Sequence, residues 1–262
     1  MCRRQVSWWT ALAVVALLAA PAFAQEVSIA DPTGDDNGPG TYSYPTDGVY
    51  KAGSFDITSF KLKVKGDKAD FEVGTNSTIE DPWGMKTGFS VQMVFIFIQT
   101  GSKGPTFTTG LPGLNIAFAP DSAWDKVVIL SPQQVGRVKN EVQTKAGAMA
   151  GAVVIPLRTR GGGRSITATV NLKDLGEGDP TKWGYQVVMQ SNEGFPDKAD
   201  LLTRKVNEYE GQHRFGGGND GECDPHAIDV LGDNKTQLAY ECGPDGSSVK
   251  TATLTMQHQG SK

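Results

Sequence analysis

The stretch Phe89-Ser-Val-Gln-Met-Val-Phe-Ile-Phe-Ile98 is the segment that decides the fold of this chain. Apolar residues occupy consecutive positions in it, so a strand formed here would be covered on both faces. The length of the run would also suit a buried helix, but its β-branched and aromatic residues favour a strand. We therefore predict a central strand with apolar layers on each side.

The sequence before this run predicts a β-hairpin. Between residues 60 and 65 the apolar residues Phe60, Leu62 and Val64 alternate with lysines. This period of two is typical of a half-buried strand with one wet face. A turn at Gly66-Asp67 follows, and the alternation resumes over residues 71–73, which predicts the second strand.

The rest of the chain predicts many short strands and little helix. Strands are expected at 114–118, 126–130, 152–158, 165–170, 184–190 and 251–256. Single helical turns are expected at 174–177 and 225–231, and loops at 101–113 and 144–151. Short strands without intervening helices predict an all-β fold, an antiparallel β-sandwich or jelly roll.

The N-terminus has the three parts of a secretory signal peptide. Arg3 and Arg4 precede an apolar run from Thr10 to Ala20, and the small-residue segment 21–24 offers a cleavage site before Gln25. A retained membrane anchor is the alternative, but the run is short for a bilayer, which needs about 20 residues. We expect residues 1–24 to be removed, residues 25–262 to form one domain, and the protein to be secreted, periplasmic or on the cell surface, with no membrane span left.

The charge of the chain argues against binding to nucleic acid. The formal net charge is −4, and loss of Arg3 and Arg4 leaves 23 basic against 29 acidic residues, or −6. The basic residues form no clustered patch, so the electrostatic footprint of a nucleic-acid-binding protein is missing.

Two cysteines remain after loss of the signal segment, Cys223 and Cys242. Two cysteines in an oxidising compartment most simply pair, so we predict a disulfide. Free thiols or half of a metal site are the alternatives, although His226 gives no recognised zinc spacing with them.

Two acidic, glycine-rich loops are candidate calcium sites. Calcium takes 6–8 hard oxygen ligands and tolerates irregular geometry. The first loop offers carboxylates beside glycines that let the backbone fold back, and the second offers a similar set next to Cys223. The candidate ligands are Asp31, Asp35, Asp36 and Asp56 from the first region, and Asp220 and Asp224 from the second. The alternative is that each Asp caps a turn through its own backbone.

Exposed aromatic rings are the natural candidates for sugar binding, because a flat ring buries the apolar face of a sugar. Trp83 and Trp124 lie outside regular strands, and Tyr42 and Tyr44 flank the first acidic loop. Packing in the core is the alternative for each of them. Trp183 begins an apolar strand and is expected in the core.

Catalytic motifs are not recognised in the sequence. The three histidines are scattered, and no nucleophile elbow, phosphate loop or dinucleotide fingerprint occurs. The carboxylates concentrate in glycine loops, so we predict a binding protein and not an enzyme.

Several segments carry a family likeness. Residues 31–47 read Asp-Pro-Thr-Gly-Asp-Asp-Asn-Gly-Pro-Gly-Thr-Tyr-Ser-Tyr-Pro-Thr-Asp, and residues 53–57 follow as Gly-Ser-Phe-Asp-Ile. Together with Pro82-Trp-Gly84, Trp183-Gly-Tyr185 and the blocks at 88–90, 215–221 and 224–231, this text resembles the glucodextranase C-terminal domain family. The likeness runs from about residue 31 to about residue 238.

This resemblance implies a β-sandwich related to DOMON-like carbohydrate-binding modules. Such domains are usually appended to polysaccharide-degrading enzymes or surface-layer anchors. The expected function is non-catalytic binding of glucan or cell-envelope polysaccharide, with calcium-stabilised loops. The alternatives are a structural or protein-interaction component of the envelope and a DOMON-type haem carrier, which the absence of a Cys-x-x-Cys-His motif weakens.

Overall fold

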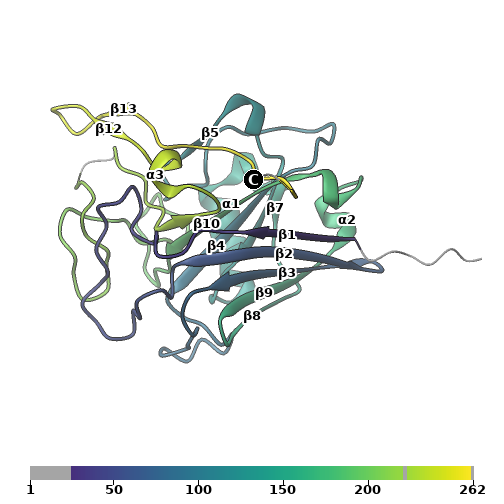
Figure 1. Ribbon diagram of the computed structural model, residues 1–262, viewed down its shortest axis with the longest axis horizontal. Coiled ribbons are helices and arrows are strands. Elements are labelled where there is room, and N and C mark those ends of the chain that lie inside the picture. The colour runs from purple at the N-terminus through teal and green to yellow at the C-terminus, as the bar shows by residue number, and fades with distance from the viewer. Residues whose placement is uncertain (1–24, 221–222, 261–262) are drawn as a thin grey trace, which may run out of the picture.

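Strand β4 (Gln92–Gln99) lies in the middle of a sandwich of two five-stranded sheets (Figure 1). The structure is a computed structural model that describes residues 25–220 and 223–260. The predicted signal peptide, residues 1–24, lies outside the described residues.

The first sheet has the order β1-β2-β3-β9-β8 and is antiparallel throughout. Its strands are β1 (Glu26–Ala30), β2 (Ile57–Lys65), β3 (Lys68–Thr75), β8 (Arg158–Gly162) and β9 (Ser165–Asn171). The predicted hairpin is therefore confirmed as β2 and β3, and the lysines of β2 line the outer face, where Lys61 pairs with Glu72 at 2.9 Å.

The second sheet has the order β11-β10-β4-β6-β7, with antiparallel pairing except between β6 and β7. Its remaining strands are β6 (Lys126–Leu130), β7 (Val153–Val154), β10 (Gly184–Ser191) and β11 (Asp229–Val230). Two small pairs complete the described strands: β5 (Ala117–Phe118) with β14 (Thr253–Leu254), and β12 (Glu241–Cys242) with β13 (Ser248–Lys250).

Two apolar cores result, one on each face of the second sheet. Ile96 and Ile98 of β4 point into the core between the sheets, whereas Phe95 and Phe97 point into a core beneath an outer layer of loops and short elements. Since side chains alternate along a strand, β4 must be apolar at both odd and even positions. The prediction of a central strand covered on both faces is confirmed.

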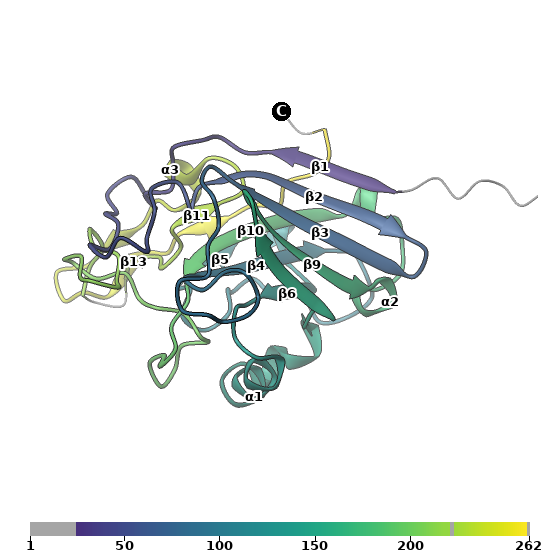
Figure 2. The ribbon, with the colours of Figure 1, turned by 90° about the horizontal axis from the view of Figure 1, so that it is seen from below.

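The outer layer contains helix α1 (Val135–Lys145), which the sequence analysis did not predict (Figure 2). Of its residues, Val138 and Val142 are buried, one turn apart, against the second sheet. Valine is a weak helix former, so the sequence signal is small. The loop expected at 144–151 is instead the end of α1 and a 3-10 helix, η2 (Gly147–Ala152).

The other helices are short. They are α2 (Leu172–Leu175), α3 (Asn234–Gln237), and the 3-10 turns η1 (Pro120–Ser122) and η3 (Pro180–Lys182). The turn expected at 174–177 is present two residues earlier as α2. The prediction of a helical turn at 225–231 is wrong, because that segment leads into strand β11, which pairs with β10. Within the described parts of the chain, none of the helices has the length and apolar content that a membrane crossing requires.

The outer core should contribute strongly to stability. Phe97 is fully buried. The centroid of its ring lies 4.8 Å from that of Phe118 and 5.1 Å from that of Trp124. We expect Phe97→Ala to lower the free energy of unfolding by about 3–5 kcal/mol in urea titrations. The exposed Val249→Ala should change it by less than about 0.5 kcal/mol. A loss below about 1 kcal/mol for Phe97→Ala would mean that the outer layer is not packed on this sheet.

Candidate functional site

A cluster of buried carboxylates lies where three strands begin or end. Asp31 follows β1, Asp56 precedes β2, and Asp229 begins β11, while Asp35 lies in the turn after Asp31. One ligand atom from each of Asp31, Asp35 and Asp229 lies within 4.8 Å of the other two. Asp56 is close enough to raise the pKa of Asp31 and Asp35 by charge repulsion. We call Asp31, Asp35, Asp56 and Asp229 the carboxylate cluster.

Backbone and side-chain amides hold one oxygen of three of these carboxylates. Gly232 N–H donates to Asp31 Oδ1 at 2.5 Å, and Ile57 N–H donates to Asp229 Oδ2 at 2.5 Å. Asp56 Oδ2 accepts from Gly34 N–H at 2.7 Å and from the side-chain amide of Asn76 at 2.9 Å. These bonds fix the direction in which each carboxylate points.

The opposite oxygens of the cluster are buried without a hydrogen-bond donor. They are Asp31 Oδ2, Asp35 Oδ1, Asp56 Oδ1 and Asp229 Oδ1. Asp229 is 0 % exposed and Asp56 is 1 % exposed, so water does not reach these carboxylates from outside. Buried polar atoms are normally paired, and an unpaired set that converges on one place points to a missing partner.

The environment raises the pKa of every member of the cluster. Burial, with repulsion from Asp35 and Asp56, raises the pKa of Asp31 to about 8, against a backbone hydrogen bond that lowers it. Burial also raises the pKa of Asp35, Asp56 and, most strongly, Asp229. Four ionised carboxylates are therefore unstable together unless a positive charge lies among them.

The donor set fits a hard divalent cation. All four groups are carboxylates, and calcium binds oxygen ligands with irregular geometry, whereas zinc prefers nitrogen and sulfur. The backbone at Gly34 has φ +83°, a conformation that favours glycine and that places its N–H on Asp56. The turn between Asp31 and Asp35 is thus shaped by the sequence to return the chain to the cluster.

Asp229 was missed by the sequence analysis, which assigned residues 225–231 to a helical turn. The available signal was an acidic residue between Ile228 and Val230 in an apolar run. A lone carboxylate in a short buried strand needs a compensating partner.

Asp36, predicted as a ligand, accepts a hydrogen bond from the hydroxyl of Tyr44. It is not among the three residues whose ligand atoms lie within 4.8 Å of one another. Tyr44 is half-buried and packs against Phe55 and Phe215, so its ring serves the loop core more than the surface.

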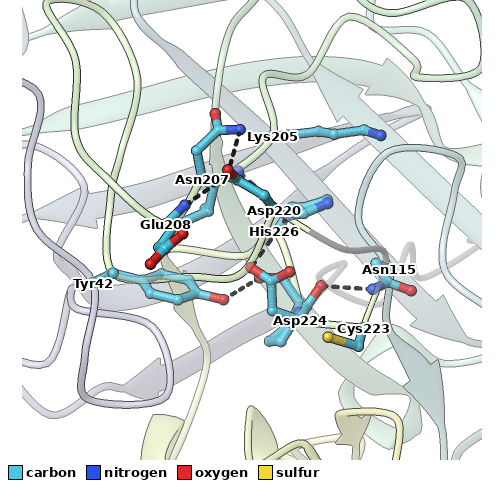
Figure 3. Close-up of polar contacts among 12 residues, drawn as sticks. Tyr42, Asn115, Lys205, Asn207, Glu208, Asp220, Cys223, Asp224 and His226 are labelled. Atoms are coloured by element: carbon cyan, nitrogen blue, oxygen red, sulfur yellow. Dashed lines mark hydrogen bonds and ion pairs between the residues drawn. The ribbon is translucent and has the colours of Figure 1, made fainter. Parts of the chain in front are cut away.

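The second acidic loop is built differently (Figure 3). Asp220 accepts from Glu208 N–H at 2.9 Å and from Asn207, and these bonds lower its pKa. Asp224 is buried, with a carboxylate oxygen 3.9 Å from His226 Nδ1. Neither Asp220 nor Asp224 belongs to the group of acidic ligand atoms found among the described residues.

The two acidic loops nevertheless lie side by side. Ser43 and Gly216 exchange backbone hydrogen bonds at 2.9 and 3.0 Å, and Gly38 N–H donates to Ile228 O at 2.9 Å. A Cβ at Gly217 would lie 2.0 Å from Thr41 O, so the glycine run permits this close approach. Segments more than 170 residues apart in sequence thus form one end of the domain.

The predicted disulfide is present. Cys223 and Cys242 are bonded, with their Cα atoms 5.4 Å apart. The bond joins the second acidic loop to β12, and a loop closed over 19 residues is expected to add about 3 kcal/mol to stability.

Two of the four candidate sugar-binding rings are buried, so the expectation of exposed faces is wrong for them. Trp124 is 0 % exposed, and its indole N–H donates to Thr109 O at 2.9 Å in the outer core. Tyr42 is also buried, and its hydroxyl donates to Pro225 O. Trp183 lies in the inner core, as expected.

Trp83 keeps an exposed ring. It is 39 % exposed and stands edge-on to Tyr50 at 6.5 Å and to His213 at 5.9 Å. Tyr50 in turn donates to the backbone carbonyl of His213 at 3.1 Å. The turn that carries Trp83 therefore packs on the same loop end as the second acidic loop.

Residues 27–255 match the family described as the C-terminal binding module, SLH-like, of glucodextranase. The match covers nearly the whole chain, so the protein belongs to this family. The family is a binding module and not a catalytic domain. No curated protein matched the sequence.

The raised pKa values predict how stability depends on pH in calcium-free buffer. Asp31 has a pKa of about 8 in the folded protein against an ordinary value of 3.8. The folded state thus binds the Asp31 proton more tightly than the unfolded state does, and this stabilises the folded protein. The stabilisation is complete below pH 3.8 and is lost as the pH rises through about 8. The side chain in Asp31→Asn stays neutral at every pH. The unfolding free energy of the variant, relative to that of the wild type, should therefore increase by about 2 kcal/mol or more from pH 5 to pH 8.

The measurement is urea unfolding of both proteins across this pH range after removal of divalent ions. Parallel pH profiles of the two proteins would contradict the assignment of a strained, buried carboxyl at Asp31.

Proposed function

We propose that this protein is an exported, non-catalytic glycan-binding module whose loop end is held together by a calcium ion. The observation that carries the proposal is the set of four buried carboxylate oxygens that lack hydrogen-bond donors, in a chain that belongs to a binding-module family. The family supports binding, and the carboxylate cluster supports the cation.

The cation has a structural role in this proposal. The cluster joins the end of β1, the start of β2 and the start of β11, and each of these segments leads into a long loop. A divalent charge among the carboxylates removes their repulsion and replaces the missing donors. The loops then keep one arrangement, which reduces the entropy lost when a ligand binds.

The glycan is expected at this same end of the domain, outside the cytoplasm. Trp83 offers an exposed indole, which packs edge-on to Tyr50 and His213. A polysaccharide with apolar sugar faces suits such a ring. Glucan and cell-envelope polysaccharide are the proposed ligand classes, in keeping with the glucodextranase family name.

A protein partner in the cell envelope is the alternative. In that case the loop end would contact another protein, and glycans would not compete with it.

Calcium should raise the thermal midpoint of the chelator-treated protein, because it binds the folded state only. At a calcium concentration 100 times the dissociation constant, the free energy of unfolding increases by about 2.7 kcal/mol. Asp229→Asn should abolish the response to calcium while raising the midpoint of the calcium-free protein, since it removes a buried carboxyl whose raised pKa makes it unfavourable at neutral pH, whether it is protonated or ionised. Differential scanning calorimetry measures both effects.

Asp220→Asn is the matched control, because Asp220 lies in the other acidic loop. It should respond to calcium as the wild type does. Loss of the response in Asp220→Asn with retention in Asp229→Asn would place the ion in the second loop, and no response in the wild type would remove calcium from the proposal.

Glycan binding is tested by affinity electrophoresis through gels that contain amylopectin, dextran, mixed-linkage β-glucan or polygalacturonate. We expect at least one neutral polymer to retard the wild-type protein. The retardation should be several-fold weaker for Trp83→Ala than for the control Leu157→Ala, which truncates an exposed residue near the first sheet. Mobility unchanged by every polymer would reject the glycan-binding function.

A further inference from the structure

A second candidate binding feature lies in the long connection between β10 and β11, residues 192–228. Connections of this length inside a domain are uncommon and are often functional. At its start stands Phe195, whose side chain is 94 % exposed. The ring contributes nothing to the core of the described chain, so its flat face is available to a ligand.

The loop that carries Phe195 is rigidly anchored. Asn192 and Thr203 form an isolated β-bridge at its base, and Glu193 N–H donates to Leu202 O at 2.9 Å. Leu202 is fully buried and adopts φ +55°, a strained conformation for leucine that persists only where the surroundings enforce it.

Helix α1 supports the same loop from the outer layer (Figure 2). Arg137 near its start donates to Gly194 O, and Lys145 at its end donates to Asp200 O at 2.7 Å and to Asp197 O at 3.2 Å. The loop is therefore set in place before any ligand arrives, which lowers the entropic cost of binding.

Behind Phe195 lies a groove of about 230 Å³. Its charged lining residues balance, with three acidic and three basic side chains: Glu193, Asp197, Asp200, Arg204, Lys205 and Arg214. Arg204 pairs with Glu193 at 2.5 Å, and Lys205 pairs with Asp197 at 3.7 Å. The groove thus presents hydrogen-bond donors and acceptors side by side with no excess charge.

This pattern matches the chemistry of a neutral sugar. Each sugar hydroxyl donates one hydrogen bond and accepts others, so adjacent hydroxyls fit a carboxylate next to a guanidinium. The C–H face of the ring is apolar and suits an aromatic wall. A charged sugar would find as many repelling as attracting groups here.

We propose that this groove, walled by Phe195 and floored by the Glu193–Arg204 pair, is a subsite for one neutral hexopyranose unit of the glycan. The inference rests on the proposed glycan-binding function and names residues that determine specificity within it. Arg214, which lines the groove, directly follows His213, against which the ring of Trp83 packs at 5.9 Å.

A larger hollow of about 790 Å³ lies elsewhere, lined by Ser102, Lys103, Asp125, Lys126 and Glu177 among others. Its aromatic lining residue, Phe107, is half-buried and packs against Trp124 with the ring centroids 4.7 Å apart. Since that ring is already occupied by packing, the hollow offers a sugar less apolar contact than the groove at Phe195.

The test compares dissociation constants for amylopectin, dextran and mixed-linkage β-glucan, measured by affinity electrophoresis on the full protein with calcium. Phe195→Ala should weaken binding of the retarding neutral polymer by about tenfold, in line with the loss of one aromatic contact. Glu193→Gln should also weaken binding of this polymer, because the amide has one oxygen that accepts hydrogen bonds where the carboxylate has two. Polygalacturonate should bind no better than the neutral polymers.

Tyr209→Ala is the matched control, since Tyr209 is 68 % exposed on a neighbouring loop and does not line the groove. Its dissociation constant should lie within twofold of that of the wild type. Phe195→Ala and Tyr209→Ala should both keep the wild-type thermal midpoint. Wild-type binding with an unchanged constant for Phe195→Ala, or an equal loss for Tyr209→Ala, would overturn the subsite and leave the proposed function standing. Tight binding of polygalacturonate alone would overturn the neutral-sugar assignment, and no binding of any polymer would overturn both proposals.

Discussion

The repulsion among the four carboxylates of the cluster, three of them buried, is the constraint on which the loop end of this protein depends. Asp31, Asp35, Asp56 and Asp229 come from segments almost 200 residues apart, and the fold brings ligand atoms of Asp31, Asp35 and Asp229 within 4.8 Å of one another. A cluster of this kind destabilises the fold when all its members are ionised, and stabilises it once a cation lies among them. In the proposed function, a cation bound by these four residues holds the first acidic loop, β2 and β11 in one arrangement.

The remaining structure divides into a rigid scaffold and an end that is built from loops. The two sheets and the outer core supply rigidity, because β4 is packed on both faces. Gly217 allows the two acidic loops to approach closely, and the disulfide fixes the second acidic loop to β12. Helix α1 has a further task, since it supports the loop of Phe195. Function in such a domain resides in loops that a stable scaffold positions.

Much of the fold was predictable from the sequence because its strands have clear periodicity. The strands at 126–130, 165–170 and 184–190 lie where the apolar runs placed them, and the double-sided run at 89–98 became the central strand. Helix α1 was missed because its two buried valines are weak helix formers, and its burial is decided by the sheet beneath it. The cysteine pair was predictable from counting alone.

The candidate site was only partly predictable. Asp31, Asp35 and Asp56 were identified because they lie in or beside an unusual glycine-rich loop. Asp229 was missed because its role comes from strand pairing, which places it against residues distant in sequence. Trp124 was expected at the surface because its local sequence is turn-like, yet tertiary contacts with Phe97 and Phe107 bury it. Local sequence therefore located the acidic loop, but only the assembled sheets determine which groups converge.

The most direct measurement is X-ray diffraction from crystals grown with calcium, using the anomalous signal of the ion. We predict one peak bound by oxygens of Asp31, Asp35, Asp56 and Asp229, at distances of about 2.3–2.6 Å. A map with no peak there, and with these carboxyl groups hydrogen-bonded to one another as neutral acids, would contradict it.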